Sequence, residues 1–299
     1  MVLSPFLASL ALLVGGGLWG VYWMPVHYLE GLGLIGATAG IAVYVGCLIA
    51  LLPAFWHYRR VFAVHWRMLL FSGLMTGAGF SLYSTSLAYT DVIRTLLLFY
   101  LTPIWGTIIG LLFLKERLTT SRIIAMVLAF GGLMVILRDA NGLPIPSNIG
   151  DVLALLSGMF WAIGSYGLLR AQAVPAIAQM IAFLLGGLFV SCLTLFMLGR
   201  VDIGFITAID YSILLPAIVL ITLYAVPMIW LTIAPARVLS PARVGILLMS
   251  EVVVGAITAA LLSGEVFGIR EVIGTALIIA AALSEISGTR QAEAQEQET

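Results

Sequence analysis

The stretch "SPARVGILLMSEVVVGAITAALLSGE", from Ser240 to Glu265, decides the class of fold. The 19 residues from Val244 to Leu262 include one charged residue, Glu251. At about 1.5 Å of rise per residue, such a run spans roughly the hydrocarbon core of a bilayer. A carboxyl near its middle costs about 2.5–3.5 kcal/mol on insertion scales, so we expect the fold or the function to offset that cost.

The composition of the whole chain points the same way. Of 299 residues, 62% are hydrophobic and 9% are charged, whereas soluble domains average near 25% charged residues. This balance excludes a soluble protein. Lys plus Arg and Asp plus Glu number 14 each, which indicates no nucleic-acid partner. Cys47 and Cys192 lie in apolar runs and predict neither a disulfide framework nor a metal site.

Apolar runs of membrane length recur along the chain and predict an all-α integral membrane protein with ten transmembrane helices. The first run lacks a positive start and a cleavage site, so we interpret it as a helix rather than a secretory signal. The expected spans are 6–29, 35–55, 68–88, 93–114, 121–138, 150–169, 176–198, 211–233, 243–262 and 270–287. A polar tail, 288–299, is expected to be disordered.

The distribution of basic residues predicts the orientation in the membrane. With both termini in the cytoplasm, ten Lys and Arg residues fall inside and four fall outside: Arg94, Arg138, Arg200 and Arg270. Cytoplasmic loops carry the excess of positive charge in most membrane proteins.

The chain also contains an internal repeat. Residues 91–118, "DVIRTLLLFYLTPIWGTIIGLLFLKERL", align with residues 240–267 at an offset of 149, which pairs Arg94 with Arg243. Earlier in the copies, Trp19 pairs with Trp161 at an offset of 142. Further pairs are Gly106 with Gly255, Glu116 with Glu265, and Cys47 with Cys192.

We therefore expect two five-helix copies, at residues 1–143 and 144–287, followed by the tail. Because five is odd, the second copy must be inverted in the membrane relative to the first. Inverted repeats are the architecture of many secondary transporters, which bind substrate near the midplane between the copies.

The two repeated segments, "YLTPIWGTIIGLLFLKE" and "LMSEVVVGAITAALLSGE", resemble the EamA family of the drug/metabolite transporter superfamily. A Pro near the middle of the helix, a small residue soon after and a closing Glu carry the resemblance, although Val252 stands where a Pro often follows the glutamate. The resemblance implies a ten-helix inner-membrane exporter. Its aromatic-rich core is similar to that of the exporters of aromatic amino acids.

Aromatic side chains inside the expected spans are candidates for a substrate site. Such rings stack on aromatic substrates at about 0.5–1.5 kcal/mol per pair, although packing between helices or lipid contact is the more common role of any single ring. Trp19 and Trp161 gain weight as repeat mates. The candidate set is Trp19, Tyr83, Tyr100, Trp105, Trp161 and Tyr224.

Glu251 is the candidate for coupling or for binding a substrate ammonium group. Its repeat mate is the uncharged Thr102, so the symmetric fold does not require the carboxyl. Two interpretations stay open: a structural carboxyl that fixes its helix, and a functional one that carries a proton or holds an ammonium group. Ser250 and Thr258 are candidates to share its hydrogen bonds.

Small and kinking residues form a third group, expected to act as hinges or packing contacts. Gly16 and Gly20 have the spacing that allows close approach of helices, and Pro103 and Pro227 each remove a backbone hydrogen bond.

These features favour a secondary transporter that exports small amphipathic metabolites, aromatic or other apolar amino acids first among them, across the inner (plasma) membrane. The expected partners are a small-molecule substrate and the lipid bilayer. No catalytic residue, cofactor or metal is expected, and the sequence sets no oligomeric state. The alternatives are a permease for another metabolite or drug and, from another class, an intramembrane enzyme that uses Glu251.

Overall fold

The computed structural model describes residues 4–34, 37–87, 89–90, 92–116, 118–136, 146–197, 210–262 and 268–297. Every regular element in that part of the chain is a helix, as the composition predicts. The first half contains α1 (Pro5–Val21), α2 (Trp23–Gly31), α3 (Ala37–Ala50), α4 (Leu52–Ser86), α5 (Val92–Phe99), α6 (Thr102–Ile109), the π-helix η1 (Gly110–Leu114) and α7 (Thr120–Ile136). The second half contains α8 (Ile149–Arg170), α9 (Ala176–Met197), α10 (Tyr211–Ala236), α11 (Pro241–Leu248), α12 (Ser250–Leu262) and α13 (Ile269–Gln297).

Seven helical segments of the described chain are long and apolar enough to cross a membrane, so the protein is a multi-pass membrane protein. Two further apolar helices, α3 and α7, are shorter than these segments. Each of the ten expected spans overlaps one or more helices, and several, such as 93–114, are divided between helices. Since seven segments have the length and apolarity of a membrane span, the count of ten stays a prediction.

Two expectations from the sequence differ from the structure. The polar loop expected between spans 35–55 and 68–88 is helical, because α4 runs through it with only a kink at His65. Pro53 lies at the start of α4, and from there to Gly73 the sequence has no Gly or Pro to end a helix. The tail expected to be disordered continues α13 to Gln297, since Ala, Glu and Gln favour helix.

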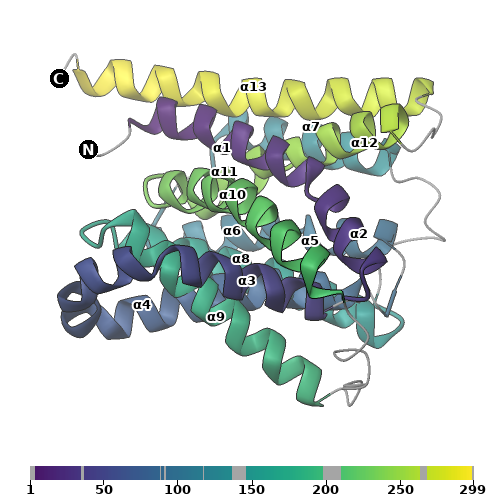
Figure 1. Cartoon of the computed structure of the whole chain (residues 1–299). Coiled ribbons are helices and arrows are strands. Elements are labelled where there is room, and N and C mark those ends of the chain that lie inside the picture. The colour runs from purple at the N-terminus through teal and green to yellow at the C-terminus, as the bar shows by residue number, and fades with distance from the viewer. Residues whose placement is uncertain are drawn as a thin grey trace.

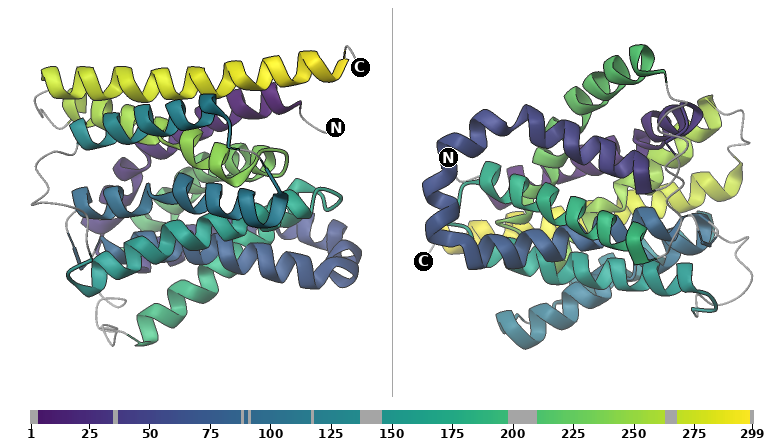
Figure 2. Two further views of the ribbon diagram at one scale, coloured as in Figure 1. Left: turned by 180° about the vertical axis from the view of Figure 1, so that it is seen from behind. Right: turned by 60° about the horizontal axis from the view of Figure 1, so that its bottom comes forward.

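The helices run largely side by side, and both ends of the chain lie at the same end of the molecule (Figure 1). α4 packs on α8 and α9, α1 on α10 and α12, α7 on α13, and α6 on α11. The view from behind agrees, and the tilted view shows α3 and α4 as two limbs joined by a bend (Figure 2).

Glycines allow the closest of these approaches. A Cβ atom at Gly73 would lie 2.4 Å from the carbonyl oxygen of Ala182, and one at Gly77 would lie 2.2 Å from the backbone nitrogen of Gly187. No real Cβ tolerates such distances, so α4 and α9 pack backbone against backbone as in other membrane helix pairs.

Candidate functional site

The first half of the site is the break between α5 and α6. Pro103 has no N–H, so the carbonyl oxygen of Phe99, four residues earlier, loses its helical partner. The hydroxyl of Thr102 donates to that oxygen at 2.6 Å, and the backbone N–H of Leu101 donates to Leu98 in a tighter turn. The break is therefore satisfied by residues next to it.

The second half is the break between α11 and α12, at the repeat-equivalent place. Here the backbone N–H of Val252 donates to Met249, three residues back, at 3.0 Å. The carbonyl oxygen of Leu248 instead accepts the hydroxyl of Tyr100 at 3.2 Å. The helix is broken here without a Pro, and a side chain from the break between α5 and α6 serves the carbonyl oxygen.

Glu251 lies in the first turn of α12, directly after this break. Its side chain is half-buried, and its Oε2 accepts the hydroxyl of Tyr100 at 2.6 Å. Tyr83 interacts with the same carboxyl from α4. Within the described part of the chain, no Lys, Arg or His forms an ion pair with it, so two phenols are its polar neighbours.

Aromatic rings connect this carboxyl to the interior of the bundle. Phe80 is the centre, with ring centroids 4.0 Å from Trp19 and 6.1 Å from Trp161. It also lies 6.2 Å from Tyr83. Phe99 then connects Tyr83, at 4.8 Å, with Tyr100, at 5.0 Å. We call Trp19, Phe80, Tyr83, Phe99, Tyr100 and Trp161 the aromatic cluster.

The polar atoms of the candidate aromatics differ in how they are used. Trp19 donates its indole N–H to the hydroxyl of Thr232 at 2.9 Å, and Tyr224 donates its hydroxyl to the carbonyl oxygen of Leu18. Both bonds tie α1 to α10 and favour a packing role for these two groups. The indole nitrogens of Trp161 and Trp105, in contrast, are buried without a hydrogen-bond partner.

The structure thus brings together four of the six aromatic candidates. Neither Trp105 nor Tyr224 makes a ring contact in the described part of the chain, and Tyr224 bonds to the backbone of Leu18 instead. Sequence reasoning missed Phe80 and Phe99, although Phe80 precedes Tyr83 by three residues and therefore shares its helix face.

The small residues and prolines have distinct positions. A Cβ at Gly16 would lie 2.2 Å from the Oγ of Ser250, and one at Gly20 would lie 2.5 Å from the carbonyl oxygen of Glu251, so both glycines pack α1 on the start of α12. Pro103 begins α6. Pro227 lies exposed inside α10, which remains one helix.

Of the expected partners of Glu251, neither bonds to its carboxyl. Ser250 donates to the carbonyl oxygen of Leu13 at 3.0 Å. Thr258 donates to the carbonyl oxygen of Gly20 at 3.3 Å.

Two ion-pair networks surround the broken helices. Arg94 of α5 contacts the carboxyl of Asp151 on α8 at 2.5 Å. Its repeat mate Arg243 contacts Glu285 on α13 at 2.9 Å, and Arg122 joins Glu285, at 3.7 Å, to Glu116, at 2.5 Å. Glu265, the repeat mate of Glu116, lies outside the described residues. In the part of the chain that the structure describes, no group of three or more His, Cys, Asp or Glu side chains could hold a metal ion.

The fold and this site define a helical membrane protein built around two broken helices. Residues 6–138 match the EamA-like transporter family. A solved structure described only as "Crystal structure of protein" superposes with a TM-score of 0.71 at 17% identity, covering 97% of this chain and 98% of the other. That likeness establishes the fold. No curated protein gives a significant match.

Proposed function

We propose that the protein is a secondary transporter of the EamA type that exports small amphipathic metabolites, aromatic or other apolar amino acids first among them. The match over residues 6–138 supports a membrane transporter. The substrate class is our inference from the site: aromatic faces suit an apolar side chain, and a carboxyl without a cationic partner suits an ammonium group.

The observation that carries the proposal is the bond between Tyr100 and Glu251 across two broken helices. When Glu251 is ionised, the Tyr100 hydroxyl donates to it. When Glu251 is protonated, it can donate to the phenol oxygen, and Tyr100 then donates to Leu248. A proton or an ammonium group at Glu251 therefore changes the bonding of the break itself, which is a route from binding to conformational change.

We also propose that residues 1–143 and 144–287 are inverted copies. Exchanged contacts support this: α8 packs on α5 and α6, while α1 packs on α11 and α12. At the breaks, Gly158 of α8 faces the carbonyl oxygen of Phe99, and Gly16 of α1 faces that of Leu248. Two copies related in this way can exchange inward-open and outward-open shapes at similar energy.

In that arrangement, the networks of Arg94 and Arg243 lie on opposite sides of the membrane. Each joins a broken helix to a neighbouring helix, so opening one side requires its network to separate. We place both termini in the cytoplasm, on the basic-residue bias and on their common end of the molecule (Figure 1).

The test is efflux from proteoliposomes loaded with a panel of labelled amino acids, with and without a pH gradient. We expect efflux of aromatic and large apolar amino acids, stimulated by the gradient. Trp161→Ala should lower efflux at unchanged protein abundance, because its ring belongs to the aromatic cluster. If no amino acid leaves the proteoliposomes faster than it leaves equally loaded liposomes without protein, the substrate class is wrong.

An intramembrane enzyme would need a second catalytic group beside Glu251. In the described residues, the groups that interact with its carboxyl are Tyr83 and Tyr100, which suit a hydrogen-bonding role better than a catalytic role in hydrolysis. We therefore favour transport.

A further inference from the structure

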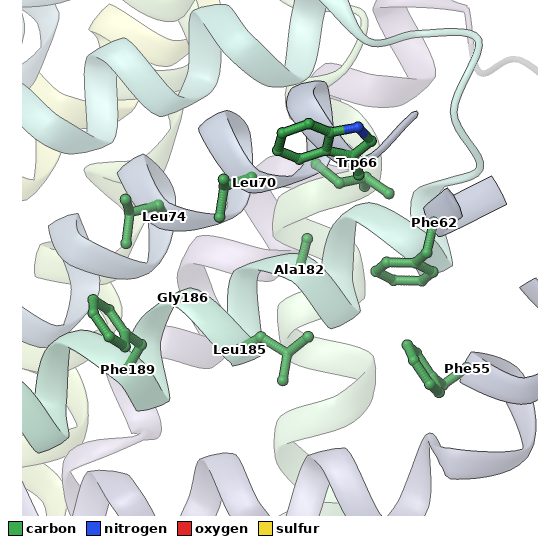
Figure 3. A pocket seen from close by; sticks show the side chains of 10 residues that line it. Phe55, Phe62, Trp66, Leu70, Leu74, Ala182, Leu185, Gly186 and Phe189 are labelled. Carbon is green, nitrogen blue, oxygen red and sulfur yellow. The ribbon is translucent and has the colours of Figure 1, made fainter. Parts of the chain in front are cut away.

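An apolar groove of about 630 Å³ opens on the outside of the bundle, between α4 and α9 (Figure 3). It shares no residue with the aromatic cluster. Its walls are hydrophobic side chains that point into one space from the two helices: Phe62, Trp66, Leu70 and Leu74 of α4, and Leu185 and Phe189 of α9. From Trp66 to Leu74 the groove follows α4 for about 12 Å, at 1.5 Å per residue.

One end of the groove carries positive charge. Arg59, Arg60 and Arg67 are exposed on α4. Arg59 follows Phe55, a lining residue, by four positions and precedes Phe62 by three, while Arg67 precedes Leu70 by three. Helical spacing therefore places both arginines on the faces that line the groove.

Two tryptophans indicate the depth in the bilayer at which this basic end lies. The guanidinium of Arg59 lies 4.5 Å from the ring centre of Trp56, and that of Arg67 lies 5.3 Å from the ring centre of Trp66. Both indoles are more than half exposed. Trp beside Arg is the combination found at the headgroup level of a bilayer, with apolar surface below it.

Neither α4 nor α9 contains an Asp or Glu residue. An amine on a bound headgroup would therefore find no carboxylate on the helices that form the groove, whereas a net negative headgroup would find three guanidinium groups. This charge complementarity selects among lipids, and it is what separates the groove from ordinary lipid-facing surface.

We propose that this groove binds an anionic phospholipid, with an acyl chain between α4 and α9 and the phosphate against Arg59 and Arg67. The occupant would hold the bend of α4 at His65, because the lining residues come from both sides of that kink. This lipid site lies outside the aromatic cluster and does not depend on the transported molecule.

The experiment is native mass spectrometry of the full chain, released from micelles that contain equal amounts of phosphatidylglycerol and phosphatidylcholine. We expect retention of phosphatidylglycerol over phosphatidylcholine by about tenfold or more, since each basic residue near the headgroups contributes about a fivefold preference. In the double variant Arg59→Gln/Arg67→Gln this preference should be largely lost.

Two further variants make the result specific. Lys115→Gln removes an exposed cation that does not line the groove, and it should leave the preference unchanged. Leu70→Trp adds bulk within the groove while keeping all three arginines, and it should lower the retention of phosphatidylglycerol.

Equal retention of the two lipids by the unmodified protein would overturn the proposal. So would a preference that survives the double arginine variant, or one that Lys115→Gln reduces as strongly. A dimer that Leu70→Trp dissociates, with no lipid retained, would assign the groove to a second copy of the chain instead. All three variants change exposed side chains, and gel filtration checks that each remains folded.

Discussion

The two broken helices are interrupted at repeat-equivalent places but are satisfied in different ways. In α5–α6, Pro103 causes the break and the neighbouring Thr102 serves the freed carbonyl oxygen of Phe99. The break between α11 and α12 contains no Pro, and the corresponding carbonyl oxygen, that of Leu248, accepts the hydroxyl of Tyr100 from the other break. The break between α5 and α6 is satisfied by residues next to it, whereas the break between α11 and α12 depends on Tyr100 of the first break.

This difference explains why a carboxyl occupies one break only. At position 102 a hydroxyl is already used to close the local turn. At the equivalent position 251, the hydroxyl of Tyr100 serves the freed carbonyl oxygen instead. The side chain of residue 251 is therefore not needed for that bond and can carry a charge. The same phenol then contacts both the carbonyl and the carboxyl. The two breaks therefore differ at the place where we propose that a proton or an ammonium group acts.

The largest effect is expected for Glu251→Gln. Gln keeps the shape and can still accept from Tyr100, but it can neither ionise nor exchange a proton. We expect efflux to fall by about tenfold or more, equivalent to about 1.4 kcal/mol, and to stop responding to an imposed pH gradient. Initial rates in proteoliposomes between pH 6 and 8 measure both quantities.

Glu30→Gln is the matched control, because it makes the same chemical change at the end of α2, where Glu30 pairs with His27 at 3.6 Å. It should leave the rate and its response to pH unchanged. Full, pH-dependent efflux by Glu251→Gln would assign the carboxyl to structure and remove the functional meaning of the asymmetry.

Much of this arrangement could be predicted from the sequence. The apolar runs predicted the helices, and the offset of 149 residues paired Thr102 with Glu251 in the alignment. The bond from Tyr100 to Leu248 could not be predicted, since it joins residues 148 positions apart and depends on how two helices cross. Periodicity also did not predict that the indole N–H of Trp19 would donate to Thr232. This bond favours a packing role for Trp19 over a role in substrate binding.

An intermediate effect is expected at the glycines that face the two breaks. A Cβ at Gly158 would lie 2.5 Å from the backbone oxygen of Phe99, whereas one at Gly16 first meets the hydroxyl oxygen of Ser250 at 2.2 Å. A hydroxyl can rotate away at the cost of its bond to Leu13, but a carbonyl cannot. Gly158→Ala should therefore cost about 1–3 kcal/mol, and Gly16→Ala about 1 kcal/mol.

The midpoint of thermal unfolding, followed by gel filtration after heating, compares these two variants. Both replacements gain the same helix propensity, so that gain cancels between them. Gly31→Ala is the control, because nothing lies within 4 Å of its added Cβ. Equal losses at Gly158 and Gly16 would mean that the two breaks are equally rigid.

The smallest effect is expected for Val252→Pro, which gives the second break the residue that causes the first. The N–H that Pro removes makes one bond, to Met249 at 3.0 Å, and the carbonyl oxygen of Leu248, four residues back, is already served by Tyr100. Thermal unfolding should therefore report a loss of at most about 1 kcal/mol. Ile257→Pro, in the middle of α12, should cost about 3 kcal/mol or more, because it removes a helical bond that no side chain replaces. If the two prolines destabilise equally, α12 is held as one helix with α11, and the break at Met249 is not a built-in counterpart of the break at Pro103.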